Sequence, residues 1–152
     1  MSLMIASPAL AVPYELRYQG TYDDLLHPLC VREIAVKPTV SIDAKGRKKI
    51  KSYAATFRGT DVGPPGIGDK ITIACDEDSI KKYGLREFEF TGIVEGTSID
   101  AGDGIHEGDY NSVKDGDSFE GIRWRDGNRW LKKSDNISPP RPPPPSKVPP
   151  NE

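Results

Sequence analysis

The sequence contains few of the residues from which metal centres and active sites are built. Its 152 residues include two cysteines, Cys30 and Cys75, and two histidines, His27 and His106. The cysteines lie in separate apolar runs without the paired spacing of a zinc site, so we expect two buried, reduced thiols, with one disulfide as the alternative. Neither histidine belongs to a serine-nucleophile, phosphate-loop or paired metal-ligand motif. We therefore predict a non-enzymatic protein without a cofactor or a bound metal.

Long hydrophobic runs are also missing. The longest apolar stretch, residues 4–13, is too short to span a bilayer, and Ser7 and Pro8 interrupt it. No lysine or arginine precedes Arg17, so the stretch is not typical of a signal peptide. We expect a soluble protein that is cytoplasmic or virion-associated, with residues 1–12 as an N-terminal extension and no membrane contact.

Proline is concentrated near the C-terminus, where residues 138–152 hold 8 of the 14 prolines. Because this segment has almost no apolar bulk to offset the entropy lost on ordering, we predict that residues 135–152 form a disordered or polyproline II tail. Residues 142–147 fit the P-x-x-P-x-[KR] form that docks in aromatic grooves, so a protein partner is an alternative to a flexible spacer. Residues 13–134 remain as one folded domain.

Strand patterns dominate this domain. Apolar residues alternate with polar ones from Ile34 to Ile42, which predicts a long, half-buried strand with a bend or bulge at Pro38. A turn at residues 44–47 leads into a second long strand at about 48–58, so the pair should form an extended hairpin. Further strands are predicted at residues 70–75, 86–95, 118–125 and 129–133, with one more at 14–18 as an option.

One short helix is predicted directly after Cys75. Asp76 is a suitable N-cap, acidic residues follow in the first turn, lysines occupy the last turn, and Gly84 supplies the stop. The resulting order, three strands, a helix, a strand, a long loop and a strand, is that of the OB-fold. We therefore predict an all-β, mainly antiparallel, small OB-like barrel with one short helix and a disordered Pro-rich C-terminal tail. Another small barrel or a sandwich is the alternative, and the likeness carries function only by analogy.

Acidic and basic residues are concentrated in different parts of the chain. The net charge of −2 hides an acidic middle, residues 61–120, with 15 Asp/Glu against 5 Lys/Arg, between two basic ends. The basic residues fall on two predicted hairpins, and this arrangement suits contact with a polyanion. They are Lys45, Arg47, Lys48, Lys49 and Lys51 on the first hairpin, and Arg123, Arg125 and Arg129 on the second.

Aromatic residues are interleaved with these basic ones. Tyr53 and Phe57 share strand parity with two of the lysines, and Trp124 and Trp130 flank the last turn. Lysines neutralise phosphates and rings accept stacked bases, which is how single-stranded nucleic acid is held without reading its sequence. In the structural alternative, Tyr53 and Phe57 face the core and the tryptophan pair stabilises its hairpin.

Acidic residues gather in a predicted loop at residues 96–117. They are Asp100, Asp103, Glu107, Asp109, Asp115 and Asp117, with His106 among them and Glu120 just beyond. Their spacing fits neither the EF-hand nor the glycine-rich nonapeptide pattern, so we expect a solvated or partner-facing loop rather than a calcium site.

The leading hypothesis is thus a non-enzymatic β-barrel that binds single-stranded nucleic acid through the basic and aromatic residues of both hairpins, as in a viral or mobile-element protein. The alternative is a structural or assembly protein, such as a virion or baseplate component, whose terminal extensions and acidic loop make protein contacts within an oligomer.

Overall fold

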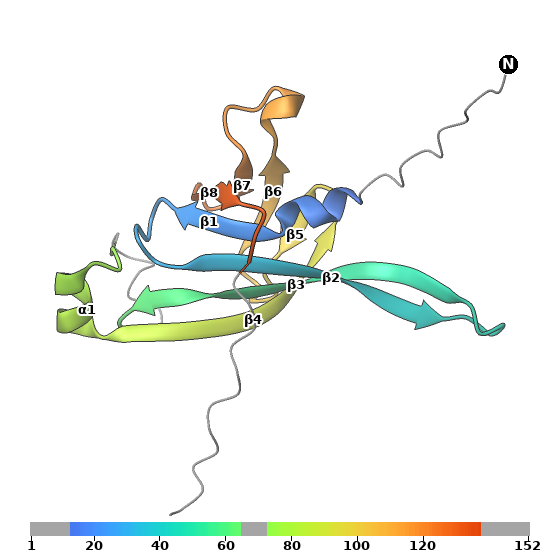
Figure 1. Cartoon of the computed structure of the whole chain (residues 1–152), viewed down its shortest axis with the longest axis horizontal. Coiled ribbons are helices and arrows are strands. Elements are labelled where there is room, and N and C mark those ends of the chain that lie inside the picture. Colours follow the sequence, from blue (N-terminus) through green and yellow to red (C-terminus); the bar gives the residue numbers. More distant parts are fainter. Residues whose placement is uncertain (1–12, 65–72, 138–152) are drawn as a thin grey trace, which may run out of the picture.

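A computed structural model describes residues 13–64 and 73–137. The predicted N-terminal extension, residues 138–152 of the predicted tail and residues 70–72 of a predicted strand lie outside the described residues. The described chain forms one closed antiparallel sheet of eight strands (Figure 1). These are β1 (Gly20–Asp24), β2 (Arg32–Ile42), β3 (Lys48–Val62), β4 (Leu85–Glu95), β5 (Ser98–Asp100), β6 (Glu107–Asn111), β7 (Gly121–Trp124) and β8 (Arg129–Ser134).

The ring follows chain order throughout. Each strand pairs with the next one in sequence, and β8 closes the ring by pairing with β1. The predicted antiparallel barrel with one short helix is confirmed: α1 (Glu77–Tyr83) begins where the side chain of Asp76 accepts a hydrogen bond from the Ser79 N–H, at 2.7 Å. The OB-like assignment is not confirmed, because the OB-fold is a five-stranded Greek-key barrel, whereas these eight strands run up and down.

Three segments differ from the sequence-based expectation. The predicted loop at residues 96–117 contains β5, β6 and the 3-10 helix η3 (Val113–Asp115). Glycine and aspartate disfavour strands locally, but pairing with neighbouring strands overrides that preference. Residues 14–18 form a 3-10 helix, η1 (Tyr14–Tyr18), rather than a strand, and residues 73–75 form no strand. Tyr18 packs edge-on against Tyr110, with ring centroids 5.1 Å apart, so η1 closes one end of the barrel.

The alternation of inward and outward residues divides the interior into zones. Along β3, inward positions run from Ala55 through Phe57 to Asp61, and along β4 they run from Val94 through Phe90 to Arg86. The zone near η1 is therefore apolar, the middle is aromatic and the opposite zone is charged. We call the end covered by η1 the closed end, and the end that carries the β1–β2, β5–β6 and β7–β8 loops the open end.

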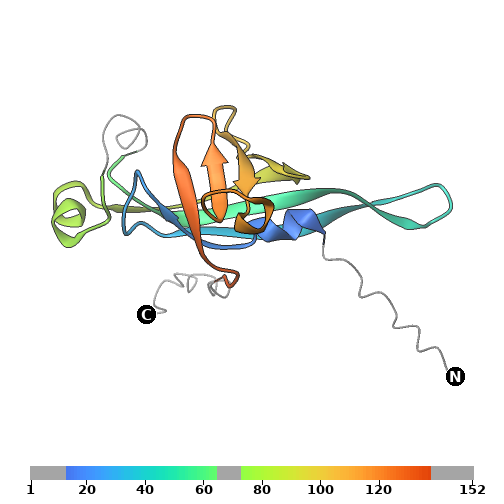
Figure 2. The same cartoon turned by 90° about the horizontal axis from the view of Figure 1, so that it is seen from above.

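The β2–β3 hairpin is much longer than the barrel. β3 pairs with β4 only from Tyr53 onward, and β2 pairs with β1 only as far as Ile34. Residues 39–52, the hairpin arm, therefore have only each other as strand partners and project beyond the closed end, away from α1 (Figures 1 and 2). The register shift expected at Pro38 falls one residue later, between Thr39 and Val40.

A disulfide joins Cys30 to Cys75, so the expectation of two reduced thiols is wrong. The spacing of 45 residues gives no hint of this bond, because proximity is created by the fold. The amide of Cys75 donates a 2.8 Å hydrogen bond to the carbonyl of Pro28, which holds the segment before α1 against the β1–β2 loop. The two Cα atoms are then 4.8 Å apart, within bonding range for a disulfide.

Removing this bond should destabilise the protein. We expect Cys30→Ala/Cys75→Ala to lower the free energy of unfolding by about 2 to 4 kcal/mol, because a loop of this length loses its cross-link in the unfolded chain. Urea denaturation measures the change. Reductant should shift wild type by a similar amount and leave the double variant unaffected. Two titratable thiols in denatured, unreduced wild type would contradict the disulfide.

Candidate functional site

A cavity of about 520 Å³ occupies the open end of the barrel. Five aromatic side chains from four strands form its walls, namely Phe57, Phe88, Phe90, Trp124 and Trp130. They support one another: the rings of Phe57 and Phe90 stack with centroids 4.9 Å apart, and the two indoles meet edge-on at 5.1 Å. Gly59 makes room for this layer, because a Cβ there would lie 2.7 Å from the ring of Phe88.

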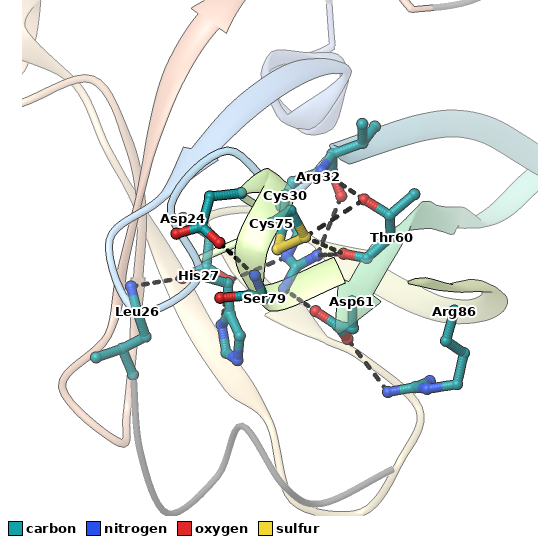
Figure 3. Close-up of a disulfide and its surroundings, with 12 residues drawn as sticks. Asp24, Leu26, His27, Cys30, Arg32, Thr60, Asp61, Cys75, Ser79 and Arg86 are labelled. Atoms are coloured by element: carbon teal, nitrogen blue, oxygen red, sulfur yellow. Dashed lines mark hydrogen bonds and ion pairs between the residues drawn. A yellow bond between two sulfur atoms is a disulfide. The ribbon is translucent and has the colours of Figure 1, made fainter. Parts of the chain in front are cut away.

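A buried arginine organises one side of the cavity mouth. The side chain of Arg32 is 3% exposed; its Nε donates to Asp24 at 3.0 Å and its Nη2 donates to Asp61 at 2.6 Å. Its Nη1 donates to the carbonyl of Thr60, also at 2.6 Å. A buried charge is tolerated only when it is paired and its hydrogen bonds are made, and Arg32 meets both conditions (Figure 3).

Asp24 has further hydrogen-bond partners besides Arg32. The carboxylate of Asp24 accepts hydrogen bonds from the backbone N–H of Leu26 and from the side-chain Nδ2 of Asn128, each at 2.9 Å. It also contacts Nδ1 of His27 at 3.0 Å. Burial alone would raise the pKa of Asp24, but the hydrogen bond with His27, the charge of Arg32 and the hydrogen bond from Asn128 outweigh it and hold the pKa at about 2.

Arg86 extends this cluster along the rim. Its Nη2 lies 3.5 Å from Asp61, and its Nε donates to the carbonyl of Gly63 at 3.1 Å. Asp24, Arg32, Asp61 and Arg86 thus alternate in sign and sum to zero. We call these four residues the charged quartet.

The opposite side of the mouth carries a smaller polar group. His106 lies between two aspartates: its Nδ1 contacts Asp103, and its Nε2 lies 3.6 Å from Asp126. Burial opposes ionisation of Asp103, but hydrogen bonds from the backbone and side chain of His106 and from the Ile105 N–H outweigh it and lower the pKa. We call Asp103, His106 and Asp126 the acidic triad.

One polar atom of the cavity wall is unsatisfied. Trp124 is 4% exposed, and its indole Nε1 is buried without a hydrogen-bond partner among the described residues. A buried donor without an acceptor costs free energy, so such groups are rare in folded proteins. The planes of this indole and of the His106 ring are nearly perpendicular, with centroids 6.2 Å apart.

The residues predicted from sequence to bind nucleic acid fall into separate groups. Lys45, Arg47, Lys48, Lys49 and Lys51 are all exposed on the hairpin arm. Arg123, Arg125 and Arg129 are exposed on the outside of the β7–β8 hairpin, near the open end. The two basic groups therefore lie toward opposite ends of the barrel and do not form one surface.

The aromatic residues of that prediction lie mainly inside the barrel. Phe57 is 1% exposed, as the structural alternative expects, and the two tryptophans are also buried, Trp124 at 4% and Trp130 at 8% exposed. Tyr53 is half-buried at the base of the hairpin arm and packs against the core. Only Tyr53 is therefore both near the lysines and partly accessible.

The charged quartet was not predicted from the sequence, although the strand parity of its two arginines could have indicated it. Arg32 occupies the same strand parity as Ile34 and Val36, and Arg86 that of Phe88 and Phe90. A charged residue in register with a buried apolar series must either end the strand or be neutralised inside the protein.

A scan against protein-family models finds no match for the chain. Searches of curated proteins and of solved structures find none either. Within residues 13–64 and 73–137, no three His, Cys, Asp or Glu side chains are grouped to hold a metal ion. None of the described helices is both long and apolar enough to cross a membrane.

The depressed pKa of Asp24 predicts an acid-sensitive contribution to stability. A carboxyl whose pKa falls from 3.8 to about 2 on folding contributes about 2 kcal/mol, present above about pH 4 and lost as the pH falls toward 2. Urea unfolding should show Asp24→Asn less stable than wild type by about 2 kcal/mol or more at neutral pH, because Arg32 also loses a partner. The difference should disappear near pH 2, since protonated Asp24 resembles asparagine.

Asp23→Asn is a matched control for this experiment. Asp23 is exposed and lies 3.6 Å from Lys133 in a surface ion pair, which is worth no more than about 1 kcal/mol. A stability difference between wild type and Asp24→Asn that is the same at every pH would contradict the assignment.

Proposed function

We propose that the protein binds a small, largely apolar molecule in the cavity at the open end of the barrel. The aromatic cavity itself carries this proposal. Eight-stranded barrels have an interior that is either filled by side chains or just wide enough for one small ligand. Here the closed end is filled and the open end keeps about 520 Å³, inside the usual range of ligand pockets.

The distribution of polar groups supports a binding role. Ligand pockets combine apolar walls with a few polar groups that fix orientation, and this cavity has five aromatic walls with charged groups only toward its rim. The quartet and triad anchor their side chains to several elements, so the rim is formed before a ligand arrives. A preformed site binds without a large ordering cost.

A neutral fluorescent probe tests the proposal. N-phenyl-1-naphthylamine should bind saturably at one site per protein and quench emission from the two wall tryptophans. Phe90→Ala removes a half-exposed wall ring, so the probe should bind about 5- to 30-fold more weakly, corresponding to about 1 to 2 kcal/mol. Ile93→Ala, on the outer face of the same strand, is the control and should leave affinity unchanged. Absence of saturable binding by folded wild type would rule the cavity out as a ligand site.

A second proposal concerns the hairpin arm, which we infer binds single-stranded nucleic acid. Its support is the projection of five basic side chains on a slender hairpin, clear of the barrel. Because Phe57 and both tryptophans are buried, charge contributes most of the affinity and stacking is confined to Tyr53. The alternative, protein contact in an assembly, is supported by the exposed apolar face formed by Val40, Ile42 and Ile50.

Salt dependence distinguishes these two uses of the hairpin arm. Lys48→Gln/Lys49→Gln/Lys51→Gln should weaken binding of an unstructured oligonucleotide and flatten the salt slope by about 0.7 per lost contact, roughly 2 in total. The control, Lys81→Gln/Lys82→Gln/Lys114→Gln, removes equal charge elsewhere and should change the slope little. No wild-type mobility shift at about 50 mM salt, where electrostatic binding is strong, would favour the assembly role.

The disulfide bears on where the protein works. Disulfides persist in oxidising compartments and are rare in the cytoplasm. We propose that the chain functions in an oxidising environment, which departs from the cytoplasmic location expected from sequence. The support is the Cys30–Cys75 bond.

A further inference from the structure

Around the cavity, acidic side chains outnumber arginines, and two of the acidic side chains are accessible to solvent. We infer that the cavity takes an organic cation, with an ammonium group at the acidic triad and an apolar body against the aromatic walls. This inference rests on the proposed ligand-binding function and specifies its substrate class.

The lining residues provide more negative than positive charge. Among the described residues around the cavity, four are aspartates, two are arginines and two are histidines, and each histidine contacts one of the aspartates. Both arginines belong to the charged quartet, whose sum is zero, so the excess negative charge comes from Asp103 and Asp126. In a partly enclosed, low-dielectric site this excess attracts cations and repels anions more strongly than it would in open water.

The two aspartates of the triad remain accessible. The side chain of Asp103 is 34% exposed and that of Asp126 is 47% exposed, whereas Asp24 in the quartet is 2% exposed. The one basic side chain that the structure places between them is the imidazole of His106. An ammonium group can therefore approach both carboxylates without breaking a buried ion pair.

The aromatic walls already contact one cationic group of the protein, the guanidinium of Arg32. The guanidinium carbon of Arg32 lies 5.2 Å from the ring centroid of Phe88 and 5.6 Å from that of Trp130. Ring faces attract cations within about 6 Å through their quadrupole. Trp124, next to His106, brings a further indole to the triad, so aromatic and acidic groups meet at one place.

A competition series in which only the head group changes tests the charge of the ligand. Octylamine, octanol and octanoate share one chain, and near neutral pH they are cationic, neutral and anionic. Each is titrated against cavity-bound N-phenyl-1-naphthylamine. We expect octylamine to displace the probe best and octanoate worst, with about tenfold or more between them.

Two sets of variants locate the charge effect. Asp103→Asn/Asp126→Asn should remove most of the preference for octylamine over octanol and octanoate. Asparagine at position 103 keeps the side-chain oxygen that accepts from the Ile105 and His106 N–H groups. The control, Glu95→Gln/Asp115→Asn, removes two charges toward the closed end and should retain the preference. A circular dichroism spectrum that matches wild type verifies that each variant is folded.

The outcomes separate this inference from the proposal on which it rests. If the probe binds but octanol or octanoate competes as well as octylamine, the cation inference is overturned and the ligand cavity stands. A preference that survives in Asp103→Asn/Asp126→Asn also overturns it. If neither the probe nor any member of the series binds folded protein, the proposed function fails as well.

Discussion

Closure of the sheet is the constraint on which the rest of this structure depends. Once β8 pairs with β1, every second side chain of each strand must fit inside a ring of fixed size. The tyrosines and aliphatic residues of the closed end fill their part of that space. The aromatic rings of the open end do not, and the cavity is the volume that remains.

The charged quartet shows how a small barrel can keep a polar rim without exposing its core. Arg32 links β2 to the end of β1 through Asp24 and to the end of β3 through Asp61. Replacing it with an apolar residue would leave Asp24 without its arginine and Asp61 with Arg86 alone. The quartet therefore combines two tasks, joining strand ends and setting the electrostatic character of the opening.

The sequence was sufficient for local features and insufficient for long-range ones. Alternation and capping located β2, β3, β4 and α1, because each depends on residues close together in the chain. Ring closure, the short strands β5 and β6, and the Cys30–Cys75 bond depend on contacts that no local pattern encodes. The cavity was missed for a related reason: the sequence analysis did not single out Arg32 and Arg86, although they share the parity of buried neighbours.

The hairpin arm has a consequence for self-association. Beyond the barrel, both of its strands offer backbone edges to which another copy could add a strand, and its apolar face would favour such stacking. Five basic side chains on so short a segment oppose this, because bringing two arms together would place like charges side by side. The basic side chains thus disfavour edge-to-edge pairing of two arms.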